Sequence, residues 1–171
     1  MNLNQHLIEK KPDILKKWFD AVAETYPDET SAFLKKKKAQ FANPVGYTLE
    51  EGLEHLFDAL LAGMLPDTVS RFLDGIVRIR AIQDFAPSEA VSFIFHLKKV
   101  VRQELGSELL LQQGFAGELA VFDSAVDDLA LFAFDLYVKC REKIYELKAN
   151  EARDATFRLL QQARIIVDNQ D

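Results

Sequence analysis

The sequence predicts an all-α protein, and three observations support this class. Its 171 residues include only 7 Gly and 5 Pro, so residues that force turns are scarce. Apolar residues recur at spacings of three and four in one segment after another, and no stretch shows the two-residue alternation of a half-buried strand. The length favours one domain with one sizeable core. We therefore expect six to eight helices in a single helical domain.

Two helical patterns precede residue 42. The first follows Pro12, a residue that suits the first turn of a helix, and ends at Pro27. A weaker pattern covers residues 28–41 and includes the lysine run 35–38, which is typical of a solvated face. Residues 43–46, which contain Asn-Pro and a Gly, are expected to break the chain.

Three further patterns fill the middle of the chain. Thr48 and Glu51 match a capping box, which predicts a helix over residues 48–64. A second helix is expected over residues 66–86. Pro66 suits its first turn, and Pro87 disfavours a helical conformation for the residue that precedes it. A third is expected over residues 88–106, where the final glycine is a good residue to end a helix.

One long helical pattern runs over residues 118–148, and a more polar tail follows over residues 151–167. Within it, residues 129–140 (LALFAFDLYVKC) are apolar on nearly all sides, so a second subunit is expected to cover one of them. The alternative is that this is the central helix of a monomeric core. The seam at alternating spacings of three and four is the predicted dimer contact and consists of Leu119, Phe122, Val126, Leu129, Ala133, Leu136 and Cys140.

Charge and cysteine content argue against several classes of function. The 27 acidic residues outnumber the 21 basic ones, and the net charge of −6 argues against a nucleic-acid partner. The single Cys140 excludes an internal disulfide and fits a reducing cytoplasm. No apolar run reaches the roughly 18 residues that span a bilayer, and no signal peptide is recognisable. We expect a cytoplasmic protein that does not insert into membranes.

His96 is the one histidine with a candidate role. It lies three residues after Phe93 on an apolar helix, where an imidazole could bind haem iron in an all-α chain of globin size. A histidine at the edge of a core stripe is more commonly a packing residue, so we expect no cofactor and keep haem ligation through His96 as the alternative. His6 and His55 are expected in solvent.

No catalytic or metal-binding constellation emerges, so we expect no enzyme. Metal motifs such as Cys-x-x-Cys and His-Glu-x-x-His are missing, as is a glycine-rich phosphate loop. Asp123, Asp127 and Asp128 read as a solvated polar face, and Cys140 as an inert thiol of raised pKa. Arg78 and Arg80 close their helix and are expected to pair with Asp84 or to cap helix carbonyls. A pocket for an apolar ligand is the second alternative, lined by Phe93, Phe95, Phe132 or Phe134.

Three strings resemble the N-terminal domain of the RsbR/RsbRD family, whose members are co-antagonists of the RsbT kinase in bacterial stress signalling. They are residues 41–53 (FANPVGYTLEEGL), 76–88 (IVRIRAIQDFAPS) and 131–145 (LFAFDLYVKCREKIY). The likeness covers most of residues 3–150, and its most specific part is VRIRAIQDF.

The resemblance implies a non-haem globin fold that dimerises and passes a signal through its C-terminal helix. It places the domain at residues 1–150 and a C-terminal helical extension at residues 151–171. The chain ends at Asp171, before any phosphorylatable STAS output domain of the kind that follows in the stressosome proteins. We therefore expect it to act through a partner protein that the sequence does not identify, or to be a fragment.

Overall fold

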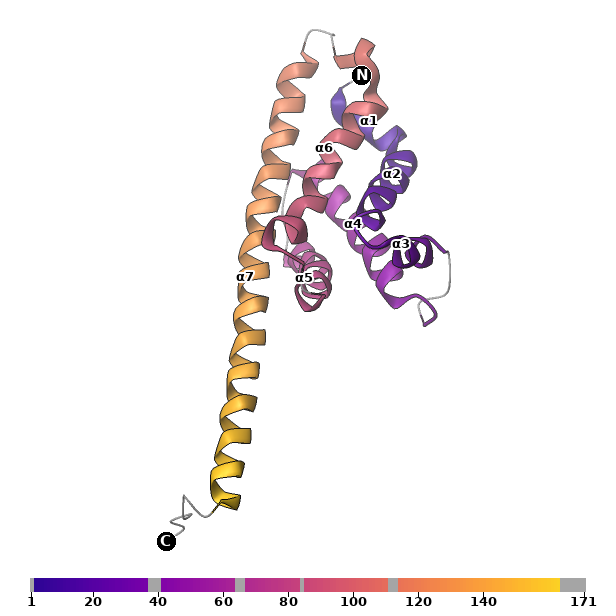
Figure 1. Cartoon of the computed structure of the whole chain (residues 1–171). Coiled ribbons are helices and arrows are strands. Elements are labelled where there is room, and N and C mark those ends of the chain that lie inside the picture. Colours follow the sequence, from indigo (N-terminus) through magenta and orange to yellow (C-terminus); the bar gives the residue numbers. More distant parts are fainter. Residues whose placement is uncertain (1, 37–40, 64–66, 84, 111–113, 164–171) are drawn as a thin grey trace.

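Seven α-helices make up the part of the chain that the structure describes (Figure 1). The computed structural model describes residues 2–36, 41–63, 67–83, 85–110 and 114–163. No strand occurs among these residues, so the predicted all-α class and helix number are confirmed. The helices are α1 (Leu3–Glu9), α2 (Lys11–Ala23), α3 (Asp28–Leu34), α4 (Pro44–Ala62), α5 (Asp67–Ile82), α6 (Pro87–Leu110) and α7 (Phe115–Gln162).

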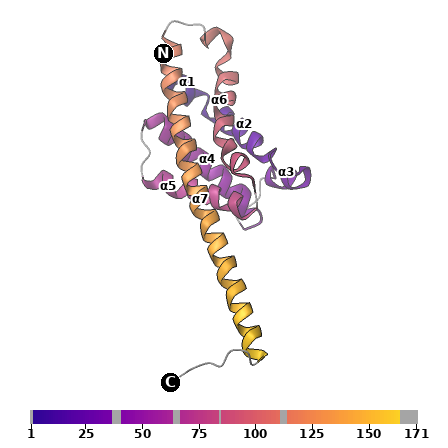
Figure 2. The ribbon, with the colours of Figure 1, turned by 60° about the vertical axis from the view of Figure 1, so that its left-hand side comes forward.

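The first six helices form a body, and α7 runs along one side of this body and continues far beyond it (Figures 1 and 2). Helix α7 packs on α6 and α5, α5 packs on α4, and α2 lies against both α4 and α6. The two longest helices, α6 and α7, are antiparallel neighbours joined at one end of the molecule.

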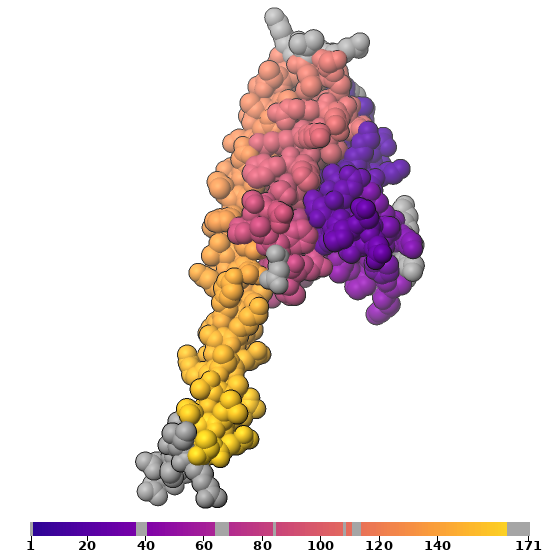
Figure 3. Space-filling model, viewed as in Figure 1, coloured from indigo at the N-terminus to yellow at the C-terminus, as the bar shows by residue number. Residues whose placement is uncertain are grey.

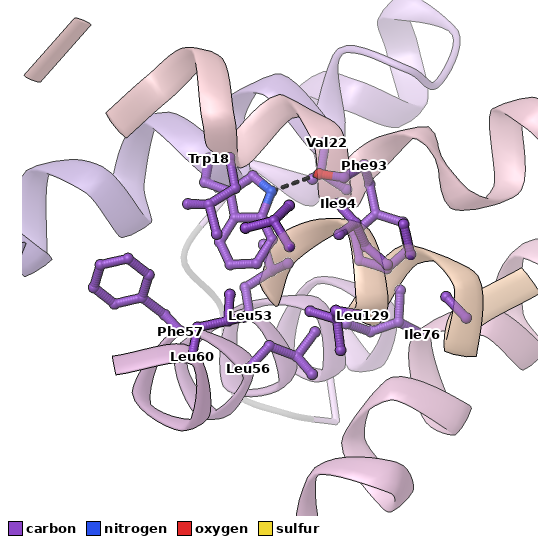
Figure 4. Packing of buried hydrophobic residues seen from close by; sticks show 14 of the residues in the cluster. Trp18, Val22, Leu53, Leu56, Phe57, Leu60, Ile76, Phe93, Ile94 and Leu129 are labelled. Carbon is purple, nitrogen blue, oxygen red and sulfur yellow. Dashed lines mark hydrogen bonds between the residues drawn. The ribbon is translucent and has the colours of Figure 1, made fainter. Parts of the chain in front are cut away.

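One hydrophobic core joins the helices of the body (Figure 4). Trp18 of α2 is fully buried at its centre, and its indole Nε1 donates a hydrogen bond of 2.6 Å to the carbonyl oxygen of Phe93 in α6. Leu53 of α4, Ile76 of α5 and Leu129 of α7 are buried in the same cluster. The apolar stripes predicted for these helices therefore all face one interior, as amphipathic helices require.

Helix α1 is a short element that the sequence patterns did not predict. Its cap is a complete capping box, because the Asn2 side chain accepts from the Gln5 amide and the Gln5 side chain accepts from the Asn2 amide. Leu3 and Leu7 are buried, and the ring of His6 lies 5.5 Å from that of Phe115. His6 is thus held at a helix–helix contact instead of moving freely in solvent.

Helix α4 begins four residues earlier than the predicted capping box. Asn43 is its cap, since the side-chain Oδ1 accepts a 3.0 Å hydrogen bond from the Gly46 amide. Thr48 lies one turn inside the helix, and its hydroxyl donates to the Pro44 carbonyl. The expected break over residues 43–46 is therefore a helix start, which Pro suits because its missing N–H is not needed in the first turn.

Glycines mark two other features of the fold. Gly106 has a φ of 73° and kinks α6 where the helix was predicted to end, and a last short turn continues to Leu110. Gly52 of α4 lies against α5, because a Cβ at this position would come within 2.7 Å of Ile76 Cδ1. An alanine at position 52 would therefore require the Ile76 side chain to shift.

Helix α7 is continuous over 48 residues, so it is about 72 Å long at 1.5 Å per residue. It passes through residues 149–150, where the predicted pattern divides into a long helix and a tail, without any break in the helix. The space-filling view shows its C-terminal part as a single helix standing away from the body (Figure 3). The last residues of the predicted tail, 164–167, lie outside the described part of the chain.

Candidate protein-interaction surface on the long helix

The predicted seam of the long helix faces the body of its own subunit. Four of its members are buried in the core, namely Phe122, Val126, Leu129 and Ala133. The other three, Leu119, Leu136 and Cys140, are partly buried against the same core. Their neighbours are mainly α5 and α6. The spacing of three and four is the same for a helix that packs within a subunit and for one that packs between subunits. The structure thus packs this seam against the hydrophobic core of its own subunit.

The opposite face of α7 is also apolar, and it stays exposed. Leu131 is 67% exposed and Phe134 is 44% exposed on this side. The exposed ring of Phe95 on α6 lies near α7, because Lys98 lies over that ring and also binds Asp127, which is one turn before Leu131. The stretch 129–140 therefore buries one side in its own core and leaves the other uncovered. Contiguous exposed apolar side chains of this kind mark interaction sites.

This exposed face carries a seven-residue repeat that continues along the helix. Five residues stand seven positions apart, and two more stand three positions after a member of that row. Together they form the outer stripe: Leu131, Phe134, Val138, Tyr145, Ala152, Ala155 and Leu159. Six of them are exposed and Val138 is half-buried. Apolar residues at these two positions of a heptad are the pattern of a coiled coil, although Arg141 and Lys148 interrupt the second row.

The C-terminal part of α7 has no support from the body. We define the projecting segment as residues 146–162, which are exposed or half-buried throughout. It carries Leu147 and Phe157 as well as the last members of the outer stripe, and Leu159 is 65% exposed. An isolated helix of this length is only marginally stable in water, because most helical stability comes from tertiary packing. The projecting segment is thus the part of the molecule that most needs a partner.

Ion pairs between α6 and α7 border the exposed apolar face. Lys98 Nζ lies 2.6 Å from an Asp127 carboxylate oxygen, and the guanidinium of Arg102 pairs with Asp123. The predicted acidic cluster is therefore a partly solvated set of interhelical contacts. No group of three or more metal-ligating side chains occurs among the described residues.

The connection between α5 and α6 is bound directly to α7. The Tyr137 hydroxyl donates a hydrogen bond of 2.6 Å to the Phe85 carbonyl, and Arg141 Nη1 donates one of 3.1 Å to the Ala81 carbonyl. Both donors are neighbours of the outer stripe on α7, and Arg141 also donates to the Tyr145 hydroxyl. A shift of this connection would therefore act on α7 at the point where the helix leaves the body.

Arg80 anchors the same connection from inside and is fully buried. Its guanidinium donates to the Thr25 hydroxyl at 3.2 Å and to the Glu89 carbonyl oxygen at 2.8 Å, and it lies 4.2 Å from the centre of the Phe85 ring. Burial lowers the pKa of this guanidinium. The sequence predicted a pairing with Asp84, which lies outside the described residues, or a cap on helix carbonyls. The Glu89 carbonyl lies in the first turn of α6, so this contact joins α5 to α6 and does not cap the end of α5.

His96 does not lie in either cavity that the structure shows. Its side chain is half-buried on α6, and its Nδ1 atom is buried without a hydrogen-bond partner among the described residues. Burial lowers the pKa of His96, and the positive charges of Arg80 and Lys99 lower it further. The half-buried position fits the edge of a core, but the unpaired Nδ1 atom differs from the hydrogen-bonded ring that is usual there.

The predicted aromatic pocket is not formed as a unit. Phe93 is fully buried in the core, Phe132 is partly buried against it, and Phe95 and Phe134 are exposed. None of the four lines the two cavities described, which lie elsewhere on the body. Burial raises the pKa of the Cys140 thiol, as predicted for its position on the packed seam.

These features define a class of protein: an all-α domain that carries an exposed apolar stripe along one long helix, which leaves the body. No helix in the described part of the chain is long and apolar enough to cross a membrane. Over residues 12–152 the chain matches the family described as "RsbT co-antagonist protein rsbRD N-terminal domain", and it belongs to this family. It is therefore a regulatory domain of the stress-response signalling type, as the three sequence strings implied.

A comparison with curated proteins adds a distant relative. The chain is 29% identical over 107 residues to an uncharacterized protein of Archaeoglobus fulgidus, a match that covers 60% of this chain and 66% of that protein. The chain thus spans just under two thirds of the length of this relative. No solved structure matches the chain.

Proposed function

We propose that the domain is a homodimeric, non-catalytic sensory domain that passes its signal to a partner protein through α7. The outer stripe carries this proposal, because it is apolar, exposed and continuous from the body into the projecting segment. In this proposal the two copies pair along their outer stripes in parallel, so that their projecting segments leave the dimer side by side. This arrangement replaces the inward-facing seam as the dimer contact.

Elementary energetics favour such pairing. Covering a large apolar side chain contributes about 1.5–3 kcal/mol, and each copy offers Leu131, Phe134, Tyr145 and Leu159. Eight such side chains in a dimer contribute on the order of 10 kcal/mol, since they are already partly covered. This is comparable to or larger than the cost of association, which is roughly 4–15 kcal/mol. We therefore expect a dimer that depends strongly on single residues of the stripe.

The path of the signal follows from the contacts of α7. Tyr137 and Arg141 hold the connection between α5 and α6, and Val138 between them belongs to the outer stripe. A change in the body that moves this connection would change how the two stripes pack. Two paired helices carry such a change along their length to whatever binds their ends.

The proposal also includes the architecture that the family resemblance implies. We propose a globin-like, haem-free body at residues 1–150 with residues 151–171 as the helical extension that reaches the partner. We place the protein in the cytoplasm, in keeping with its single cysteine.

Light scattering on the purified chain tests the dimer. The expected mass is twice the 19.5 kDa of one chain. A Leu131→Arg variant should give the single-chain mass, because a charge would be buried in the stripe without a partner. The matched control is Ile8→Arg, which changes an exposed apolar residue of α1 and should leave the dimer intact. A wild-type chain that stays at 19.5 kDa at micromolar concentration would refute the dimer.

Deletion of the extension tests the relay. A chain cut after Lys148 keeps the whole body and should lose the partner that the full chain captures from the native host, while its helical spectrum per residue stays the same. Capture of the same partner by both chains would show that the body, and not the extension, provides the output contact.

A further inference from the structure

Three buried side-chain polar atoms have no hydrogen-bond partner among the described residues, namely Tyr26 Oη, Arg80 Nε and His96 Nδ1. They come from the turn after α2, from the last turn of α5 and from α6. The central carbon of the Arg80 guanidinium lies 5.4 Å from the centre of the Tyr26 ring and 5.6 Å from that of Phe93, one turn before His96. Buried polar atoms are normally hydrogen-bonded, so three unpaired ones in one neighbourhood require an explanation.

The hydrogen bonds of the guanidinium leave one donor unused. Nη1 and Nη2 of Arg80 both donate to the Thr25 hydroxyl at 3.2 Å, and Nη2 also donates to the Glu89 carbonyl oxygen at 2.8 Å. The Nε–H group remains, and the Tyr26 hydroxyl lies beside the same guanidinium. Even where this hydroxyl accepts from Nε–H, its own proton still needs an acceptor. Two donors therefore lack an acceptor in this part of the core.

The charge of the guanidinium is not balanced by contact with a carboxylate of the described residues. The Glu89 carboxylate acts on it only at a distance, because this carboxylate accepts a 3.1 Å hydrogen bond from the Ala86 amide. Neutral acceptors and aromatic rings reduce the cost of burying a cation, but they do not neutralise it. A water molecule would accept from both donors and leave the charge unchanged. A small anion would accept from both donors and balance the charge as well.

We propose that the Nε–H group of Arg80 and the hydroxyl of Tyr26 bind one monatomic anion of the size of chloride. We call these two residues the anion site. Both Nη atoms already donate, so the guanidinium does not offer the pair of parallel N–H groups that holds a carboxylate or a phosphate. Arg80 is fully buried and Tyr26 is 6% exposed, so a larger ligand would have to displace core side chains. The inference concerns binding in the body, so it stands or falls separately from the proposed dimer.

Thermal unfolding of the full chain tests the site when chloride replaces gluconate at constant ionic strength. A site with a dissociation constant of about 10 mM raises the melting temperature by about 3–6 °C at about 200 mM chloride, because chloride binds the folded chain only. The rise should be linear in the logarithm of the chloride concentration once the site is mostly filled, as one-site binding requires. A melting temperature that does not rise with chloride would overturn the proposal.

Two tyrosine variants locate the effect. Tyr26→Phe keeps the ring and removes one donor, so it should weaken chloride binding at least about tenfold and reduce the rise in melting temperature to less than half. In gluconate this variant should be at least as stable as the wild type, because the hydroxyl has no partner there. Tyr47→Phe removes the hydroxyl of an exposed ring on α4 and should keep the full rise. An equal rise in Tyr26→Phe and the wild type would overturn the assignment to Tyr26.

Bromide identifies the ion directly, because its anomalous X-ray scattering distinguishes it from water. Crystals of the full chain in sodium bromide should show one anomalous peak within hydrogen-bond distance of both Arg80 Nε and Tyr26 Oη. A water molecule at this position, or bromide bound only at exposed lysines, would overturn the anion site. Light scattering in chloride and in gluconate reports separately on the dimer.

Discussion

The buried guanidinium of Arg80 has no carboxylate beside it among the described residues, and its surroundings explain how the charge is tolerated. Two oxygens accept from it, and the rings of Phe85, Tyr26 and Phe93 have their centres 4.2, 5.4 and 5.6 Å from its central carbon. Aromatic faces attract a cation more strongly when water is excluded. The planar group of arginine can make these contacts at once, which a lysine ammonium cannot.

Removal of this side chain should therefore be costly. We expect Arg80→Ala to lower the free energy of unfolding by about 3 kcal/mol or more, because it leaves a cavity and removes the buried hydrogen bonds to Thr25 and to the Glu89 carbonyl. Urea titration of both proteins measures the difference. The matched control is Arg78→Ala on the same helix, which removes an exposed i,i+4 pair with Asp74 and should cost less than about 0.5 kcal/mol. Equal costs for the two variants would contradict the role assigned to Arg80.

The lowered pKa of His96 predicts that the free energy of unfolding depends on pH. Its pKa is lowered in the folded protein by burial and by the charges of Arg80 and Lys99, so the folded state takes up this proton less readily than the unfolded chain. Its contribution to stability is therefore present above the ordinary histidine pKa of about 6.5 and is lost as the pH falls below it.

Urea titrations at about pH 7.5 and about pH 5.5 test this dependence. The loss of unfolding free energy between the two pH values should be smaller in His96→Gln than in the wild type. His55→Gln keeps His96 and alters an exposed ring that stacks on Phe72 at 3.9 Å, so it is the matched control. A loss as large in His96→Gln as in the wild type would show that this histidine does not carry the effect.

The surroundings of some of these side chains could be predicted from the sequence, and those of others could not. The raised pKa of Cys140 followed from its position on an apolar seam, because burial disfavours the thiolate. The burial of Arg80 was not predictable, since a charged residue on a helix is normally solvated and its two acceptors come from residues 55 and 9 positions away. Such long-range contacts leave no local signature in the sequence.

The start of α4 shows how a buried polar side chain defines an element. Asn43 accepts from the Gly46 amide and donates through Nδ2 to the carbonyls of Leu34 and Lys36, so one side chain caps α4 and ends α3. A Cβ on residue 46 would lie 2.4 Å from that Nδ2 atom. Both helices therefore depend on a glycine at this position.

Alanine substitution should act in opposite directions at two helical glycines. Gly46→Ala should lower the free energy of unfolding by about 1–3 kcal/mol, because its methyl group displaces the Asn43 side chain. Gly117→Ala should raise it by roughly 0.5 kcal/mol, since no atom lies within 4 Å of the new methyl group and alanine loses less backbone entropy in a helix. Thermal unfolding of the two variants measures both signs, and a gain in stability for Gly46→Ala would contradict the assigned role of Asn43.

The long helices could be predicted from the spacing of their apolar residues, but the exact ends of these helices could not. The patterns predicted α2, α4, α5, α6 and α7, because each buries a stripe that repeats over several turns. Helix α1 has seven residues, too few to show a period, and the Asn2 cap with Leu3 and Leu7 was its only signal. Thr48 and Glu51 matched a capping box, yet the Asn-Pro sequence just before them supplies the actual start.

The whole molecule shows why the sequence could not decide whether the seam of α7 packs within its own subunit or against a second copy. Periodicity along α7 identified a packed stripe, but a stripe packs identically against α5 and α6 or against a second copy. The second apolar side, which includes Leu131 and Phe134, became visible as a separate surface once the body was seen to occupy only the first. The apolar character of residues 129–140 on nearly all sides therefore indicated both surfaces, whereas the spacing of the seam alone did not separate them.

The projecting segment offers a direct measurement of what the outer stripe does. A solitary helix over residues 146–162 would open often, because isolated helices of this length are marginal in water, whereas paired helices protect their amides. We expect hydrogen exchange in this segment to be slow in the wild type at high concentration and at least about tenfold faster in Leu131→Arg, while core amides near Leu53 and Ile76 exchange equally in both. Since residue 131 lies more than two turns before the segment, such acceleration requires that pairing, and not local contact, holds the helix. Fast exchange in the concentrated wild type would show that the stripe is unpaired in solution, and the relay would then need a different partner for α7.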